Sequence, residues 1–100
     1  MDLDRETLLA ELRALQPALI GRGVTHAALF GSRARRDNRP DSDVDLLIDI
    51  DETRKFSLLD LAGVAREVED HVRLPANISM RRSLDEEILE DARRDQIFIF

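Results

Sequence analysis

Apolar residues recur at helical spacing in two parts of the chain. The first row comprises Leu8, Leu9, Leu12, Leu15 and Leu19. It predicts a helix that Asp4 caps at its start and that Pro17 ends or kinks. The second row comprises Leu58, Leu61, Ala62, Ala65, Val68 and Val72. It predicts an amphipathic helix over residues 57–72, with Ser57 as its N-cap.

Three shorter apolar runs predict strands. Residues 24–30 follow a glycine-marked turn and have the composition of a buried strand. Residues 73–80 form a weaker strand, which Pro75 confines to a sheet edge or to a strand start. Residues 44–50 alternate in character, so their side chains divide between the two faces of a sheet. One face carries Val44, Leu46, Ile48 and Ile50, and the other carries Asp43, Asp45, Leu47 and Asp49.

Two short helices complete the predicted elements, and an extended tail follows them. Ser32 is expected to open a helix that runs to about Asp37, and Ser83 to cap a helix over roughly residues 84–94. In the tail, two phenylalanines alternate with isoleucines, so a strand there is apolar on both faces. The tail is therefore either buried in the core, or it docks one face on a partner through Phe98 or Phe100.

Composition narrows the class of protein. The chain has 100 residues and is 43% hydrophobic, which predicts one domain, residues 1–100, with one modest core. Its 15 Lys and Arg against 21 Asp and Glu give a formal net charge of -6, so direct nucleic-acid binding is not expected. Without cysteine it can form neither a disulfide nor a thiolate metal site. Neither a signal peptide nor a membrane-spanning run is indicated, so a cytoplasmic location away from membranes is expected.

The segment between the first two predicted strands carries the candidate chemistry. Asp43 and Asp45 lie two apart on a strand, which directs both carboxylates to one face. Such oxygen ligands suit Mg²⁺ or Mn²⁺, which in a two-metal arrangement activate the attacking oxygen and neutralise phosphate charge. Gly31 and Ser32 precede a helix, where free backbone N–H groups favour a phosphate. Further positive charge is available from Arg33, Arg35, Arg36 and Arg39.

Each of these features also has a purely structural interpretation. A Gly-Ser turn before a helix is usually a cap, an arginine cluster is usually solvated, and the segment between them is ordinary loop chemistry. The order of the features favours a functional site. Asp43 and Asp45 stand inside a predicted strand among apolar residues, where aspartate is disfavoured, and a purely structural protein would gain nothing from two like charges there.

The stretch "GSRARRDNRPDSDVDLLI" resembles the Gly-Ser, spacer, Asp-x-Asp signature of the nucleotidyltransferase superfamily that includes DNA polymerase beta. In length and layout the chain is similar to the minimal nucleotidyltransferases (MNT), which are encoded beside HEPN-domain partners in prokaryotic toxin–antitoxin pairs. This resemblance implies an α/β fold with a small mixed sheet flanked by helices. It also implies a nucleoside triphosphate site formed by Gly31, Ser32, Arg33 and Ser42, and a metal site formed by Asp43, Asp45 and Asn77.

Two residues depart from the family's pattern. Asn77 stands in the next strand where the family usually has a third carboxylate. An amide can coordinate a metal through its carbonyl oxygen, but it is neutral and cannot act as a general base. Asp49 is a poor substitute, because it lies roughly 20 Å from Asp43 along an extended strand. Arg36 stands where the family commonly has a small residue, which leaves the path of that turn open.

The resemblance implies an antitoxin that transfers AMP from ATP to a tyrosine hydroxyl of a HEPN-family ribonuclease toxin. A small domain can catalyse such a transfer, because phosphoryl transfer depends chiefly on positioning and charge neutralisation. The alternative is a catalytically weak or inactive antitoxin that neutralises its partner by binding alone. Antibiotic nucleotidylation is less expected, since it needs a substrate-binding domain for which 100 residues leave no room. Either antitoxin can assemble as a homo- or hetero-oligomer.

Overall fold

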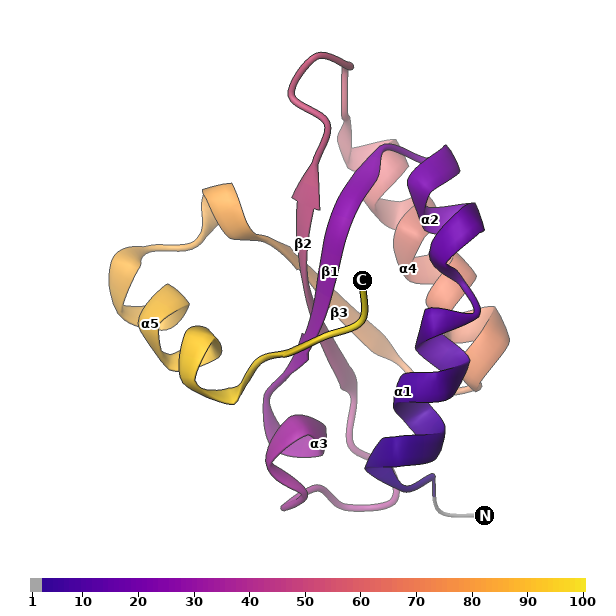
Figure 1. Cartoon of the computed structure of the whole chain (residues 1–100), viewed down its shortest axis with the longest axis vertical. Coiled ribbons are helices and arrows are strands. Elements are labelled where there is room, and N and C mark those ends of the chain that lie inside the picture. Colours follow the sequence, from indigo (N-terminus) through magenta and orange to yellow (C-terminus); the bar gives the residue numbers. More distant parts are fainter. Residues whose placement is uncertain (1–2) are drawn as a thin grey trace.

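The fold is a four-stranded mixed sheet with helices on both faces (Figure 1). The computed structural model describes residues 3–100. In sheet order the strands are β3 (Ala76–Met80), β2 (Val44–Ile50), β1 (Val24–Phe30) and β4 (Ile97–Phe98). Strand β2 pairs antiparallel with β1 and parallel with β3, and β4 is antiparallel to β1. The predicted α/β class is confirmed, and the strand after Pro75 lies at a sheet edge as expected.

Helices α1, α2 and α4 cover one face of the sheet, and α5 lies on the other (Figure 1). Their bounds, with those of the short α3 and of the 3-10 turn η1, are α1 (Arg5–Arg13), α2 (Gln16–Gly21), α3 (Ser32–Arg35), α4 (Leu58–Val72), η1 (Arg81–Ser83) and α5 (Glu86–Asp95). None of the helices within residues 3–100 has the length and apolar character needed to span a bilayer.

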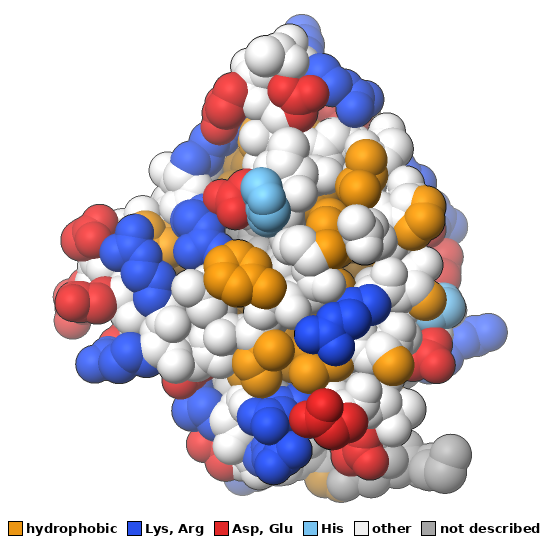
Figure 2. Space-filling model, in the orientation of Figure 1, with side chains coloured by type: hydrophobic (Ala, Val, Ile, Leu, Met, Phe, Trp, Pro, Cys, Tyr) orange, Lys and Arg blue, Asp and Glu red, His pale blue; other side chains and the backbone are white. Residues whose placement is uncertain are grey.

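Charged side chains of both signs are interspersed on the surface drawn in Figure 2. Apolar side chains lie between them in small groups. A basic stripe is the usual footprint of proteins that bind a nucleic-acid backbone, and the part of residues 3–100 seen on this face has no such stripe. On this face an anionic ligand would therefore be attracted by individual side chains rather than by a broad positive field.

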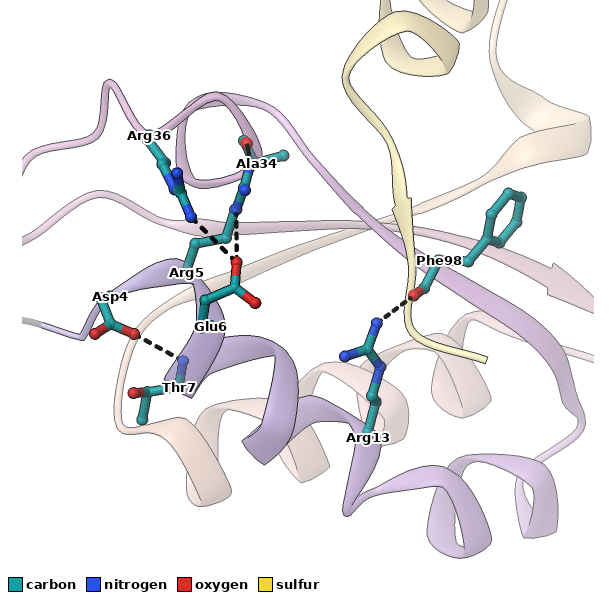
Figure 3. Close-up of polar contacts among 8 residues, drawn as sticks. All are labelled: Asp4, Arg5, Glu6, Thr7, Arg13, Ala34, Arg36 and Phe98. Atoms are coloured by element: carbon teal, nitrogen blue, oxygen red, sulfur yellow. Dashed lines mark hydrogen bonds and ion pairs between the residues drawn. The ribbon is translucent and has the colours of Figure 1, made fainter.

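The N-terminal leucine row forms two helices, because the helical conformation is interrupted between Arg13 and Gln16. Pro17 lies in the first turn of α2, where its missing N–H costs no helical hydrogen bond. Asp4 caps α1 as predicted, and its carboxylate accepts a hydrogen bond from the Thr7 N–H at 2.7 Å (Figure 3). Local sequence signals thus set both helix starts.

Helix α4 starts where predicted and buries part of the predicted row of residues. Ser57 and Asp60 form a reciprocal capping box at its N-terminus. The buried residues are Val64, Val68 and Val72. Leu58, which the sequence suggested as part of the inward row, is 80% exposed. Val68 and Val72 belong to the predicted row, and Val64 lies one turn before Val68 on the same side of the helix. The docking of the helix on the sheet decides how far toward the N-terminus this side is covered.

Helix α5 begins at Glu86 rather than at residue 84. Ser83 belongs to η1, and Asp85 caps the helix by accepting a hydrogen bond from the Ile88 N–H at 3.0 Å. Serine and aspartate are both good caps. Ser83 is part of the turn η1 that follows β3, so Asp85 caps the helix instead.

Strand β2 is buried on both faces at its centre. Val44, Leu46 and Ile48 are fully buried in the main core, which confirms the predicted inward face. Leu47 points to the opposite face and is covered by Leu89 and Ala92 of α5. Helix α5 therefore packs between Asp45 and Asp49, the two acidic residues that flank Leu47 on this face.

The two sides of the C-terminal tail differ in burial. Ile99 is 5% exposed and belongs to the main core, and Phe100 packs against that core. Arg13 of α1 donates hydrogen bonds to the carbonyl oxygens of Phe98 at 3.1 Å (Figure 3) and Ile99 at 3.4 Å. The Phe98 side chain, in contrast, is 52% exposed. One side of the tail is core, and the other exposes an aromatic ring to solvent.

Arg33 is buried, with a relative exposure of 2%. Its guanidinium donates hydrogen bonds to the carbonyl oxygens of Ser42 at 3.0 Å, Pro40 at 3.0 Å and Leu3 at 3.3 Å. One side chain thus joins α3 to the loop that leads into β2. A buried charge is tolerated because the planar guanidinium meets several acceptors at once.

We expect Arg33→Met to lower the free energy of unfolding by about 2–4 kcal/mol, because it removes the donors of three hydrogen bonds in the interior. Arg39→Met is the matched control. Arg39 is exposed in the loop that Arg33 contacts, so its substitution should change the free energy of unfolding by no more than about 0.5 kcal/mol. Urea unfolding followed by circular dichroism measures both values, and equal effects of the two substitutions would contradict this role of Arg33.

Candidate active site

Three polar side chains meet at one end of the β1-β2-β3 part of the sheet. Asp45 of β2 is paired with Phe30 of β1 and with Asn77 of β3. The Asn77 Nδ2 donates hydrogen bonds to Asp43 Oδ2 at 2.8 Å and to Asp45 Oδ1 at 3.2 Å. The structure therefore brings together the three residues that the sequence suggested as metal ligands.

Gly31 lies against the Asp45 carboxylate, because β1 ends opposite Asp45. Its φ of 77° and ψ of -158° are accessible to glycine and costly for other residues. A Cβ atom at this position would overlap Asp45 Oδ2. The backbone conformation and the available space both require glycine. Ser32 begins α3 directly afterwards, so the Gly-Ser turn and the aspartate pair form one site.

Burial raises the pKa of the Asp45 carboxyl group, and the adjacent Asp43 charge raises it as well. The hydrogen bond from Asn77 and the positive charge of Arg35 both act in the opposite direction. Because the net pKa shift is upward, these two neighbours do not fully compensate for the lost water. A divalent cation would supply the missing positive charge, so the carboxylate pair fits a metal site.

The donor set at this position is two carboxylates and one amide. Within residues 3–100, no group of three His, Cys, Asp or Glu side chains lies close enough together to hold a metal ion. Asp49 lies further along the same strand, and Arg81 binds it through Nε at 3.2 Å. Asn77 is therefore the side chain that stands beside the pair where a third acid would complete the set, and its nitrogen faces the carboxylates.

Arg33 and Ser42, which the sequence suggested as nucleotide-binding residues, form hydrogen bonds within the loop that leads into β2. Arg33 points to carbonyl oxygens in the interior and is buried. Ser42 accepts a hydrogen bond at Oγ from the Arg39 N–H at 2.8 Å, and its carbonyl accepts one from Arg33. In this arrangement, Arg33 and Ser42 set the path by which the chain reaches Asp43.

Arg35 is the arginine whose charge acts on the site, which the sequence did not single out. It lowers the pKa of Asp45, although burial outweighs this effect. Its guanidinium bonds Asp37 at 3.0 Å and Asp95 of α5 at 2.7 Å. Its position in the last turn of α3, next to the aspartate strand, would have been the signal for its selection.

The turn that follows α3 contains Arg36 in the left-handed conformation, with a φ of 67°. Glycine, which lacks a Cβ atom, would adopt this φ at lower cost than arginine. Arg36 pairs with Glu6 of α1 at 3.2 Å, and Arg5 donates a hydrogen bond to the Ala34 carbonyl oxygen at 2.9 Å (Figure 3). Contacts with α1 thus hold α3 and its strained cap in place.

The chain is similar to known proteins in sequence and in fold. A protein of Methanocaldococcus jannaschii, provisionally named a protein adenylyltransferase, is 40% identical over 58 residues. These residues are 58% of this chain and 60% of that protein, so the match spans less than two thirds of the relative.

Two solved structures have the same fold. One is provisionally described as a minimal nucleotidyltransferase and superposes with a TM-score of 0.81 at 33% identity, covering 94% of each chain. The other is a tri-AMPylated HEPN toxin from Shewanella oneidensis in complex with an MNT antitoxin, with a TM-score of 0.69 at 11% identity, covering 96% of this chain and 71% of that one. The family model described as the nucleotidyltransferase domain matches residues 5–99. Since it spans nearly the whole chain, the protein belongs to the nucleotidyltransferase domain family, and its fold is that of a minimal nucleotidyltransferase.

Proposed function

We propose that this protein is an antitoxin that transfers AMP from ATP to a tyrosine hydroxyl of a HEPN-family ribonuclease toxin. The observation that carries the proposal is the contact of Gly31 with Asp45, which joins a phosphate-binding type of turn to a carboxylate pair. The similarity to an MNT antitoxin in complex with an AMPylated HEPN toxin supports the choice of AMP and of the partner.

In the proposed reaction the tyrosine hydroxyl loses its proton to water and its oxygen attacks the α-phosphorus of ATP. The bond from that phosphorus to the oxygen bridging to the β-phosphate breaks, and pyrophosphate leaves. Asp43 and Asp45 would hold Mg²⁺ or Mn²⁺, which when bound neutralises phosphate charge and activates the attacking oxygen. The backbone N–H groups around Gly31 and Ser32 would receive the triphosphate. The protein contributes mainly position and charge, which is what phosphoryl transfer requires.

The acceptor hydroxyl must come from another chain, because this chain contains no tyrosine. Incubation of the protein alone with labelled ATP therefore gives a background free of tyrosine modification. Label that appears only when the toxin is added reports transfer between the two proteins.

A second candidate function is neutralisation by binding alone. It is favoured by the amide at residue 77, since no third carboxylate lies beside Asp43 and Asp45 within residues 3–100. In that case the fold and the partner surface are retained while transfer is slow or absent. The two candidate functions share a partner and differ in whether AMP is transferred.

Removal of both carboxylates should weaken the binding of ATP with Mg²⁺. We expect the Asp43→Ala, Asp45→Ala double variant to bind at least about tenfold more weakly in calorimetry, which corresponds to about 1.4 kcal/mol. Asp49→Ala is the matched control, since Asp49 lies on the same face of β2 but pairs with Arg81. Wild-type affinity in the double variant would refute the site.

Replacement of the amide by a carboxylate should accelerate transfer. Asn77→Asp adds an anionic ligand and a possible base while keeping nearly the same side-chain size, so we expect a rate at least about tenfold higher, or about 1.4 kcal/mol of barrier. Incorporation of labelled AMP into the toxin measures the rate. An unchanged rate would mean that the third ligand comes from elsewhere or that the protein acts by binding alone.

The exposed aromatic ring of Phe98 is the proposed anchor for the toxin. Aromatic anchors commonly carry a large share of binding energy. Deletion of the tail would be uninformative, because Ile99 belongs to the core. A point substitution at Phe98 leaves the core contacts of its neighbours in place.

We expect Phe98→Ala to weaken toxin binding at least about tenfold while the melting temperature changes by only a few degrees, because the ring is half exposed. Leu59→Ala on α4 is the matched control, since Leu59 is 84% exposed on a helix that covers the opposite face of the sheet. Calorimetry with the toxin compares the two. Equal affinities would place the interface elsewhere.

A further inference from the structure

The amide of Asn77 joins the two carboxylates of the candidate site. Its Nδ2 lies 2.8 Å from Asp43 Oδ2 and 3.2 Å from Asp45 Oδ1. An amide nitrogen has two hydrogens, and both neighbours are acceptors, so each carboxylate can receive one of them. Asn77 and Asp45 are partners in the parallel ladder of β3 and β2, so the strands themselves hold this contact.

These hydrogen bonds offset a cost that the metal-free protein would otherwise carry. Asp43 and Asp45 bear like charges next to each other, and Asp45 is partly withdrawn from water. Hydrogen bonds to ionised acceptors are roughly twice as strong as those between neutral groups. Asn77 therefore stabilises the pair in the absence of a cation.

A cation and the Asn77 nitrogen compete for the same carboxylate oxygens. Mg²⁺ binds such oxygens at about 2.0–2.1 Å and Mn²⁺ prefers the same class of ligand. Two carboxylates cannot close around an ion while an N–H donor lies between them. The Asn77 side chain must release both hydrogen bonds first, and it can then offer at most one neutral oxygen in return.

We propose that Asn77 is a positioning residue that clamps Asp43 and Asp45 in the metal-free protein, so that a divalent ion binds tightly only together with the triphosphate. The inference rests on the proposed function, because it assumes that this pair is the metal site. Phosphate oxygens add the ligands that offset the loss of the clamp. The site then responds to the metal–nucleotide complex rather than to the free ion.

The sign of one substitution separates this role from that of a simple ligand. If Asn77 serves mainly as a metal ligand, its removal weakens the binding of a free ion. If it serves mainly as a clamp, its removal strengthens that binding, because the competing donor disappears. Asn77→Ala makes this change without adding a new ligand.

The experiment is calorimetric titration of the full chain with Mn²⁺ alone, without nucleotide. We expect Asn77→Ala to bind Mn²⁺ at least about threefold more tightly than the wild type, which corresponds to about 0.7 kcal/mol. Ser79→Ala is the control, since Ser79 is two residues further along the same edge strand and lies opposite Leu47. It should bind as the wild type does. Equal or weaker binding by Asn77→Ala, including no measurable binding by either protein, overturns the clamp.

Thermal unfolding supplies a second readout. Metal-free Asn77→Ala should melt below the wild type, and saturating Mn²⁺ should raise its melting temperature more than that of the wild type. Asn77→Val repeats both tests with a side chain that favours strands, should the alanine variant fold poorly. Because nucleotide and toxin are absent, failure of the clamp leaves the proposed transfer reaction untouched, and failure to transfer AMP leaves the result for the clamp standing.

Discussion

The pairing of β2 on both of its edges is the constraint on which the candidate site depends. The antiparallel ladder places the end of β1, and with it Gly31, against Asp45. The parallel ladder places Asn77 on the other side of the same residue. A shift of either register by one residue would turn these side chains to opposite faces of the sheet. The buried row of β2 prevents that shift, so the hydrophobic core also holds the polar site in register.

Positive charge in this acidic protein acts locally. A net charge of -6 gives no general attraction for a nucleotide, so nearby groups must supply it. Arg33 is withdrawn from that role, because its guanidinium is used to tie the loop before Asp43 to α3 and the N-terminus. Arg35 remains close enough to act on Asp45, and its bond to Asp95 links the site to α5. The loop is stabilised by one arginine and the site is tuned by another.

An amide at residue 77 has different consequences in two states of the protein. In the metal-free state its N–H groups stabilise two adjacent carboxylates, whereas a third carboxylate would add to their repulsion. With a cation present, a carboxylate would be the stronger ligand. Asparagine at residue 77 therefore stabilises the metal-free carboxylate pair at the expense of strong binding of the free ion. The two proposed functions, AMP transfer and neutralisation by binding, would use the same scaffold, and they differ in what they require of residue 77.

The sequence by itself determined the features that depend on local physics. Alternation along one strand placed Asp43 and Asp45 on a shared face, and cap chemistry set the start of α4 at Ser57, because periodicity and capping involve residues only a few positions apart. It could not determine that Val64 is covered while Leu58 at the start of α4 is exposed, since this depends on how the helix docks on the sheet. Only the tertiary structure decided that Arg33 turns inward and that Asn77 donates to both aspartates. Asn77 lies 34 and 32 residues from Asp43 and Asp45, and one acceptor of Arg33, Leu3, lies 30 residues away. Only the packing of the sheet and helices brings these groups within hydrogen-bond distance.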